Sequence, residues 1–66
     1  MNDETIVLRM TPQEADSVAY VLMTALGRVG MLDREQTDAT NAANALFKQL
    51  GYGHHTDKHG QRIEDK

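Results

Sequence analysis

The sequence contains no cysteine and no tryptophan, and it has one proline, one phenylalanine and two tyrosines among its 66 residues. The lack of cysteine excludes disulfides and metal sites built from thiolates. A chain of about 60 residues buries only roughly 60% of the surface that it exposes when unfolded, so its own core leaves it marginally stable. The sequence therefore predicts one small domain that needs further stabilisation, either from a metal held by histidine and carboxylate or from a second chain.

A strongly basic region and a long apolar run are also missing. The seven basic and ten acidic residues give a net charge of −3, which argues against nucleic-acid binding without excluding it. The longest apolar stretch, residues 18–32, is interrupted by Gly27, Arg28 and Gly30 and is shorter than the about 20 residues of a membrane span. Because the first residues, MNDET, are acidic rather than basic, we expect no targeting segment. The lack of cysteine favours a cytoplasmic location.

Residues 5–10 (TIVLRM) alternate in a pattern typical of a β-strand with one buried face. The β-branched residues at the centre of the segment favour the same structure. Its two faces would carry three residues each: Ile6, Leu8 and Met10 on one, and Thr5, Val7 and Arg9 on the other.

The sequence TPQE, which follows directly, predicts the start of a helix. Thr11 is a suitable N-cap, Pro12 suits the first helical position, and Glu14 completes a capping box. We expect this helix to span residues 12–29 and to end with Gly30 in the left-handed conformation. Its apolar residues cover more than one face, so the helix should contact more than one neighbour. The expected core stripe comprises Ala15, Val18, Ala19, Leu22, Leu26 and Val29.

A second helix is predicted over residues 33–50, with Asp33 as its N-cap. The first half of its apolar face is alanine, which allows close approach to the first helix, and its larger side chains lie in the last turn. Gly51 suits the left-handed position after the helix, where Tyr52 can pack on Phe47. Two helices joined by so short a loop should be antiparallel.

After Gly53 the sequence becomes polar, and Ile63 is the only aliphatic residue that remains. Residues 57–60 (DKHG) predict a turn with its glycine at positive φ, so a short hairpin is one interpretation. The polarity of the segment favours a flexible tail. The chain is therefore divided into a domain at residues 1–53 and a polar tail at residues 54–66.

The predicted fold class is α+β, with one N-terminal β-strand, an antiparallel pair of helices and a polar C-terminal tail. A lone strand leaves its backbone donors and acceptors unpaired, and the same strand of a second copy is its best partner. A second copy would also cover the remaining apolar side of the first helix. We therefore expect a homodimer formed through the strand, with an interface that comprises Ile6, Val7, Leu8, Val21, Leu22, Met23 and Ala25.

The order strand, helix, helix over residues 5–50 resembles that of the ribbon-helix-helix regulators, in which paired strands from two chains enter the major groove of DNA. The resemblance implies DNA binding through the outward-facing residues Thr5, Val7 and Arg9, with Arg9 able to contact guanine. The helix start TPQEA is also similar to that of small strand-helix-helix proteins of actinobacterial phages. This second resemblance implies an accessory protein of a phage or another mobile element.

Three histidines near the end, His54, His55 and His59, are the residues whose types suggest a metal site. Histidines four residues apart can share one face of a helix, as in paired zinc ligands, but the surrounding glycines argue against a helix and the segment offers no closed set of four ligands. A catalytic set of Ser17, Asp16 and a histidine has no spacing that brings its members together. We therefore predict no metal, no cofactor and no enzymatic activity.

Tyr20 and Met23 lie at the edge of the apolar stripe of the first helix. Both residue types favour interfaces, and ordinary core packing is the alternative explanation. The sequence therefore predicts a small non-catalytic protein-interaction module in which Tyr20 and Met23 contact an unidentified partner protein. The alternative is a DNA-binding regulator of the ribbon-helix-helix type.

Overall fold

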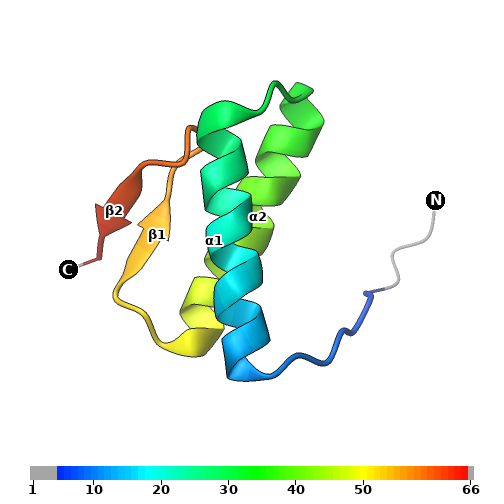
Figure 1. Cartoon of the computed structure of the whole chain (residues 1–66), viewed down its shortest axis with the longest axis vertical. Helices are drawn as coiled ribbons and strands as arrows, with labels where there is room; N and C mark the ends of the chain where they lie inside the picture. Colours follow the sequence, from blue (N-terminus) through cyan, green and yellow to red (C-terminus); the bar gives the residue numbers. More distant parts are fainter. Residues whose placement is uncertain (1–4, 66) are drawn as a thin grey trace.

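The computed structural model describes residues 5–65 and contains two helices followed by a β-hairpin. The helices are α1 (Pro12–Arg28) and α2 (Asp33–Leu50), and the strands are β1 (His54–Thr56) and β2 (Arg62–Glu64). The helices are antiparallel, the hairpin covers one side of the pair, and the N-terminal segment leaves on the other side (Figure 1). Neither of these two helices is long and apolar enough to cross a bilayer.

The predicted N-terminal strand is wrong. Residues 5–10 are not part of any strand, and the order of elements is helix, helix, hairpin rather than strand, helix, helix. Alternating polarity shows that a segment can form a strand, but a strand also requires a hydrogen-bonding partner. Within the described residues, β1 and β2 pair with each other and leave none for residues 5–10. The predicted completion of the fold by dimerisation through this strand fails with it.

Of the two structures considered for the polar end of the chain, the hairpin is the one present. β1 and β2 are antiparallel, with His55 opposite Ile63. On the other edge of β1, the side-chain amide of Asn44 pairs with the backbone of Thr56: Asn44 Oδ1 accepts from Thr56 N at 2.8 Å, and Asn44 Nδ2 donates to Thr56 O at 3.0 Å. Because an α2 side chain satisfies this edge, β1 is held between β2 and α2, and Thr56 is only 1% exposed.

The predicted start of α1 is confirmed. Thr11 Oγ1 accepts a hydrogen bond from Glu14 N at 3.1 Å, and Glu14 Oε1 accepts one from Thr11 N at 2.9 Å. The backbone hydrogen bond from Thr11 lowers the pKa of the Glu14 carboxyl group. The predicted left-handed Gly30 is wrong, because α1 ends at Arg28, the backbone is already extended at Val29, and Gly30 has no positive φ.

α2 begins with Leu32 at the N-cap, one residue earlier than predicted. The backbone N–H of Leu32 donates to Glu35 Oε1 at 2.9 Å, so the glutamate caps the helix although the N-cap side chain is apolar. At the other end the prediction is confirmed: Gly51 has φ 76°, and Tyr52 N donates to Phe47 O at 3.1 Å. The rings of Tyr52 and Phe47 lie 6.0 Å apart.

Phe47 is the centre of the core. It is fully buried together with Ala19 and Ala43, where the two helices meet. The small alanines let the helices approach closely, and the phenyl ring contacts both α1 and the hairpin. The partly buried apolar residues around this cluster are Tyr20, Leu22, Met23, Leu46 and Tyr52. Among the described residues, Phe47 is the one large apolar side chain that is buried completely.

Asp57 organises the turn between β1 and β2. Its Oδ1 accepts hydrogen bonds from the backbone N–H groups of His59 at 2.8 Å and Gln61 at 3.0 Å. Gly60 donates its N–H to the Asp57 carbonyl at 3.1 Å and has φ 78°, which confirms the predicted turn. The turn is thus closed around one carboxylate.

Acid should loosen this turn. The backbone N–H groups of Gln61 and His59 stabilise the charged carboxylate and lower the pKa of Asp57 below its ordinary value of 3.8. The resulting stabilisation is present above the pKa of the unfolded chain and is lost as the pH falls through the lower pKa of the folded state. We therefore expect the free energy of unfolding, measured by urea denaturation at a series of pH values, to decrease below about pH 4.

Asp57→Asn is the matched control for this experiment. Its amide oxygen can still accept both hydrogen bonds, but the group does not gain a proton in this pH range. The variant should therefore lose less stability on acidification than the wild type does. Equal losses in the two proteins would show that Asp57 does not cause the acid sensitivity.

Candidate functional site

The three histidines do not gather into one site. His54 is buried at 6% exposure, His55 Nδ1 lies 2.5 Å from Asp65 Oδ1, and His59 is exposed in the turn. Successive residues of a strand point to opposite faces, which separates His54 from His55. No group of three or more histidine, aspartate or glutamate side chains within residues 5–65 could hold a metal ion.

His54 joins the hairpin to the helices. Its Nε2 lies 3.2 Å from the Tyr20 hydroxyl, and its ring meets the edge of Phe47 with centroids 4.5 Å apart. Its other nitrogen, Nδ1, is buried and has no hydrogen-bond partner among the described residues. These contacts are those of a core residue that fixes β1 against α1 and α2.

Asp16 also has a structural role. Its Oδ1 accepts a hydrogen bond from the Tyr52 hydroxyl at 2.6 Å, which ties the end of α2 to α1. The carboxylate stabilises the protonated phenol and raises the pKa of Tyr52. Asp16 is therefore engaged by a tyrosine, and the structure assembles no Ser17–Asp16–histidine set among the described residues.

The residues predicted to contact a partner, Tyr20 and Met23, pack mainly against the core. Tyr20 meets Phe47 edge-on at 5.2 Å, and its hydroxyl is engaged by His54. Met23 lies partly buried beside the same cluster. The core-packing explanation therefore accounts for both side chains, although the edge of Tyr20 still reaches the surface described below.

The residues of the predicted dimer interface do not form one surface. Ile6, Val7 and Leu8 are exposed in the N-terminal segment, where they line with Leu22 the groove described below, and the same segment carries the exposed residues Thr5 and Arg9. The helical residues divide between the core and the surface: Leu22 and Met23 pack toward the core, and Val21 and Ala25 lie on the outer side of α1. No paired strands bring these residues together.

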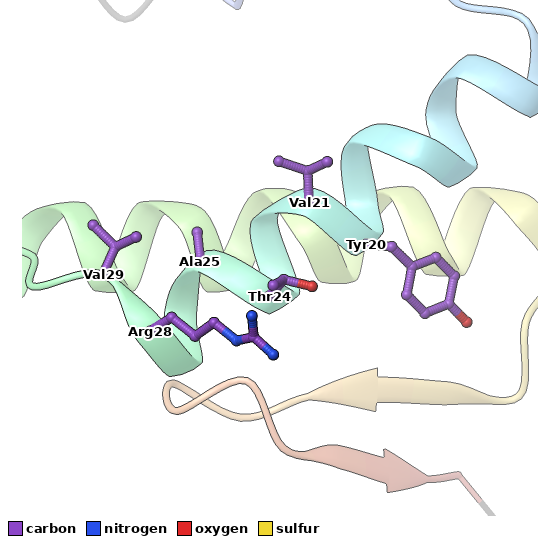
Figure 2. Close-up of a pocket in the computed structure, with 6 residues that line it drawn as sticks. All are labelled: Tyr20, Val21, Thr24, Ala25, Arg28 and Val29. Atoms are coloured by element: carbon purple, nitrogen blue, oxygen red, sulfur yellow. The ribbon is translucent and has the colours of Figure 1, made fainter.

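A group of exposed and half-buried side chains runs along the outer side of α1. We call it the α1 outer surface; it lines a shallow hollow of about 420 Å³ and comprises Tyr20, Val21, Thr24, Ala25, Arg28 and Val29. Figure 2 shows Val21, Ala25 and Val29 pointing away from the hairpin, and the three others in a second row on the hairpin side. Val21 and Val29 are 66% and 58% exposed, and the small Ala25 between them leaves the hollow.

Arg28 places a positive charge at one end of this surface. Within residues 5–65 it takes part in no ion pair. The pairs found there are Arg34–Asp38, His55–Asp65 and Arg62–Glu64. A cation in the last turn suits the negative end of the helix dipole, and the exposed guanidinium can still bind a carboxylate. An apolar row beside a cation can bind an amphipathic segment that carries an acidic residue.

A second apolar concavity lies between the helices on the side away from the hairpin. We call it the interhelical groove; it has a volume of about 660 Å³ and none of its lining residues is charged. α1 contributes Val18 and Leu22, α2 contributes Ala42 and Leu46, and the N-terminal segment contributes residues 6–8 and Met10. The groove is suited to apolar packing rather than to chemistry on a polar ligand.

The sequence did not lead us to include Thr24, Arg28 and Val29 among the binding residues. The signal that could have found them is their spacing, because residues four apart follow one side of a helix. Val29 was instead predicted to lie in the core, but α1 ends before it.

The chain matches no protein-family model, no curated protein and no solved structure.

Proposed function

We propose that this chain is a small non-catalytic protein-interaction module that binds a partner protein through the α1 outer surface. The observation that carries the proposal is the apolar row of the exposed Val21 and Val29 with the half-buried Ala25 between them, beside an arginine that forms an ion pair with no described acidic residue. None of these three apolar side chains belongs to the buried core of the chain.

The geometry favours an amphipathic helix as the partner element. Val21 and Ala25 lie about 6 Å apart along α1, since a helix rises 1.5 Å per residue, and Val29 follows at the C-cap. A partner helix with apolar residues three and four positions apart can place them in the hollow above Ala25. An acidic residue near one end of that helix would pair with Arg28, and the Thr24 hydroxyl can hydrogen-bond at the rim.

The alternative function, a regulator of the ribbon-helix-helix type, has less support. It requires two strands side by side so that Thr5, Val7 and Arg9 of each chain face the DNA, and residues 5–10 form no strand in this structure. The cytoplasmic location and the origin from a phage or mobile element stay predictions from the sequence.

Placing an acidic residue on the α1 outer surface should weaken partner binding. We expect each of the variants Arg28→Glu and Val21→Asp to capture roughly tenfold less partner than the wild type. Arg28→Glu removes the ion pair with the partner, and Val21→Asp places a charge against its apolar groups. Both positions are exposed, so the helical circular dichroism should be unchanged. The measurement is affinity capture from a lysate of the producing cells, with mass spectrometry quantifying the protein enriched by the wild type.

Arg34→Glu provides the matched control. It makes the same change of net charge on α2, in a first turn where an acidic residue suits the helix dipole. This variant should capture as much partner as the wild type. An equal loss in Arg34→Glu would assign the effect to net charge, and equal capture by all four proteins would rule out the α1 outer surface as the binding site.

A further inference from the structure

The interhelical groove is an apolar surface that the described chain leaves uncovered. On its N-terminal side, Ile6 is 92%, Val7 85% and Leu8 70% exposed. On its helical side, Val18 is 38% exposed and Ala42 faces solvent. Soluble monomers rarely expose contiguous apolar surface of this kind unless it is a binding site. The groove therefore calls for an occupant.

The small core indicates that this occupant also stabilises the fold. The buried apolar residues among those described are Ala15, Ala19, Leu26, Ala43 and Phe47. Three of these five are alanines, which bury little apolar area, and the chain has no cysteine to form a disulfide. A fold this small usually needs support from outside its own core. An occupant that supplies this support must be present whenever the chain is, and a second copy meets that condition.

We infer that a second copy of this chain covers the interhelical groove, with the two grooves facing each other across a two-fold axis. Each chain carries a net charge of −3, which opposes self-association through most faces. The groove is lined without a charged residue, so two copies can meet there without opposing like charges. A basic partner would gain no electrostatic attraction from this uncharged face.

The shape of the groove fits this arrangement. Ala42 and Ala45 are exposed on α2, so another helix can approach its backbone closely. Residues 6–8 lie at the rim, where those of one copy can pack over the helices of the other. The contact consists of side chains packed between helices, and it requires no shared β-sheet.

This inference does not depend on the function proposed above. The α1 outer surface and the interhelical groove share no lining residue. A substitution in one can therefore be tested without altering the other, and each proposal can fail while the other holds.

Ala42→Glu should separate the dimer. By light scattering after size exclusion, the wild-type chain is expected to have twice its 7.4 kDa mass at micromolar concentration and above. Because each copy of the variant would bury a carboxylate in an apolar interface, we expect its dissociation constant to rise by at least roughly 100-fold. The position is solvent-exposed in the helix and glutamate is a good helix former, so the substitution itself should not disturb α2. The separated chain should be less stable than the dimer, because it loses the support of the second copy.

Asn41→Glu is the matched control, because it introduces the same charge at the neighbouring exposed position, outside the groove. It should remain dimeric, and Leu8→Asp, which lies outside both helices, should dissociate as Ala42→Glu does. Three results would overturn the inference: a monomeric wild type, an Ala42→Glu dimer as tight as the Asn41→Glu dimer, or an Asn41→Glu dimer that dissociates as readily as Ala42→Glu. A monomeric wild type that still captures a partner through the α1 outer surface would overturn only this inference.

Discussion

Replacing Phe47 with alanine should lower the free energy of unfolding by about 3–5 kcal/mol, the cost typical of removing a buried phenyl ring. Phe47 is fully buried, and three other rings pack against it: His54 at 4.5 Å, Tyr20 at 5.2 Å and Tyr52 at 6.0 Å. The cavity would lie where α1, α2 and the hairpin meet, so each of these contacts would weaken. Because a small domain has only about 5–15 kcal/mol in total, much of the variant should be unfolded.

The measurement for Phe47→Ala is urea denaturation followed by circular dichroism. Wild type and variant are compared at one protein concentration, because self-association would make stability depend on concentration. Val21→Ala serves as the control: its side chain is 66% exposed, and the expected change is within about 0.5 kcal/mol. A loss below about 1 kcal/mol for Phe47→Ala would contradict a core centred on this ring.

Replacing Gly60 with alanine should destabilise the protein by about 2 kcal/mol or more, which is unusually large for adding one methyl group. Gly60 has φ 78°, where a residue with a Cβ atom is disfavoured by roughly 1–2 kcal/mol. The added Cβ would also lie 2.4 Å from the Met23 carbonyl oxygen and 3.0 Å from the Gly27 nitrogen. Both are backbone atoms of α1 and cannot rotate away, so the hairpin turn would have to leave the helix.

Two other glycines separate the two causes. Gly51 has a similar φ of 76° but no atom within 4 Å of an added Cβ, so Gly51→Ala should show the conformational cost alone, about 1 kcal/mol. Gly53 has neither feature, and Gly53→Ala should be neutral or slightly stabilising. Urea denaturation of all three variants should place Gly60→Ala well above the others. An equal loss in the free energy of unfolding for Gly60→Ala and Gly51→Ala would show that the turn does not pack against α1.

The helices were predictable because their signals are local. The capping box of Thr11 and Glu14 and the left-handed Gly51 involve atoms only a few residues apart, and both are present. The turn at residues 57–60 was recognised for the same reason. Errors at the ends were small: the N-cap of α2 lies one residue early, and α1 ends at Arg28.

The strands were not predictable in the same way. Residues 5–10 carry the stronger strand pattern and form none, whereas β1 and β2 come from a segment with one aliphatic residue. What stabilises β1 lies outside the segment, on α2: the Asn44 amide on its open edge and the Phe47 ring against His54. The polar C-terminal segment was therefore interpreted as a flexible tail, because its own sequence does not show that Asn44 and Phe47 of α2 contact it.

The candidate surfaces divide similarly. The residue pattern showed that α1 has more apolar surface than a single neighbouring element can cover. The distribution of this surface was not recognised: the hairpin engages Tyr20, while Val21 and Val29 are left exposed. The position of Arg28 beside that row depends on where α1 ends.

The amino-acid order alone determined two capped, antiparallel helices and the absence of disulfides, because capping, helix periodicity and composition act within a few residues of the chain. Only the tertiary structure decided that the histidine-bearing end completes the core, that the N-terminal segment is left without a sheet, and which helix faces stay open. These outcomes depend on hydrogen bonds between residues 10 to 36 positions apart and on the rings that pack against Phe47. No local pattern specifies which of the possible partners will meet.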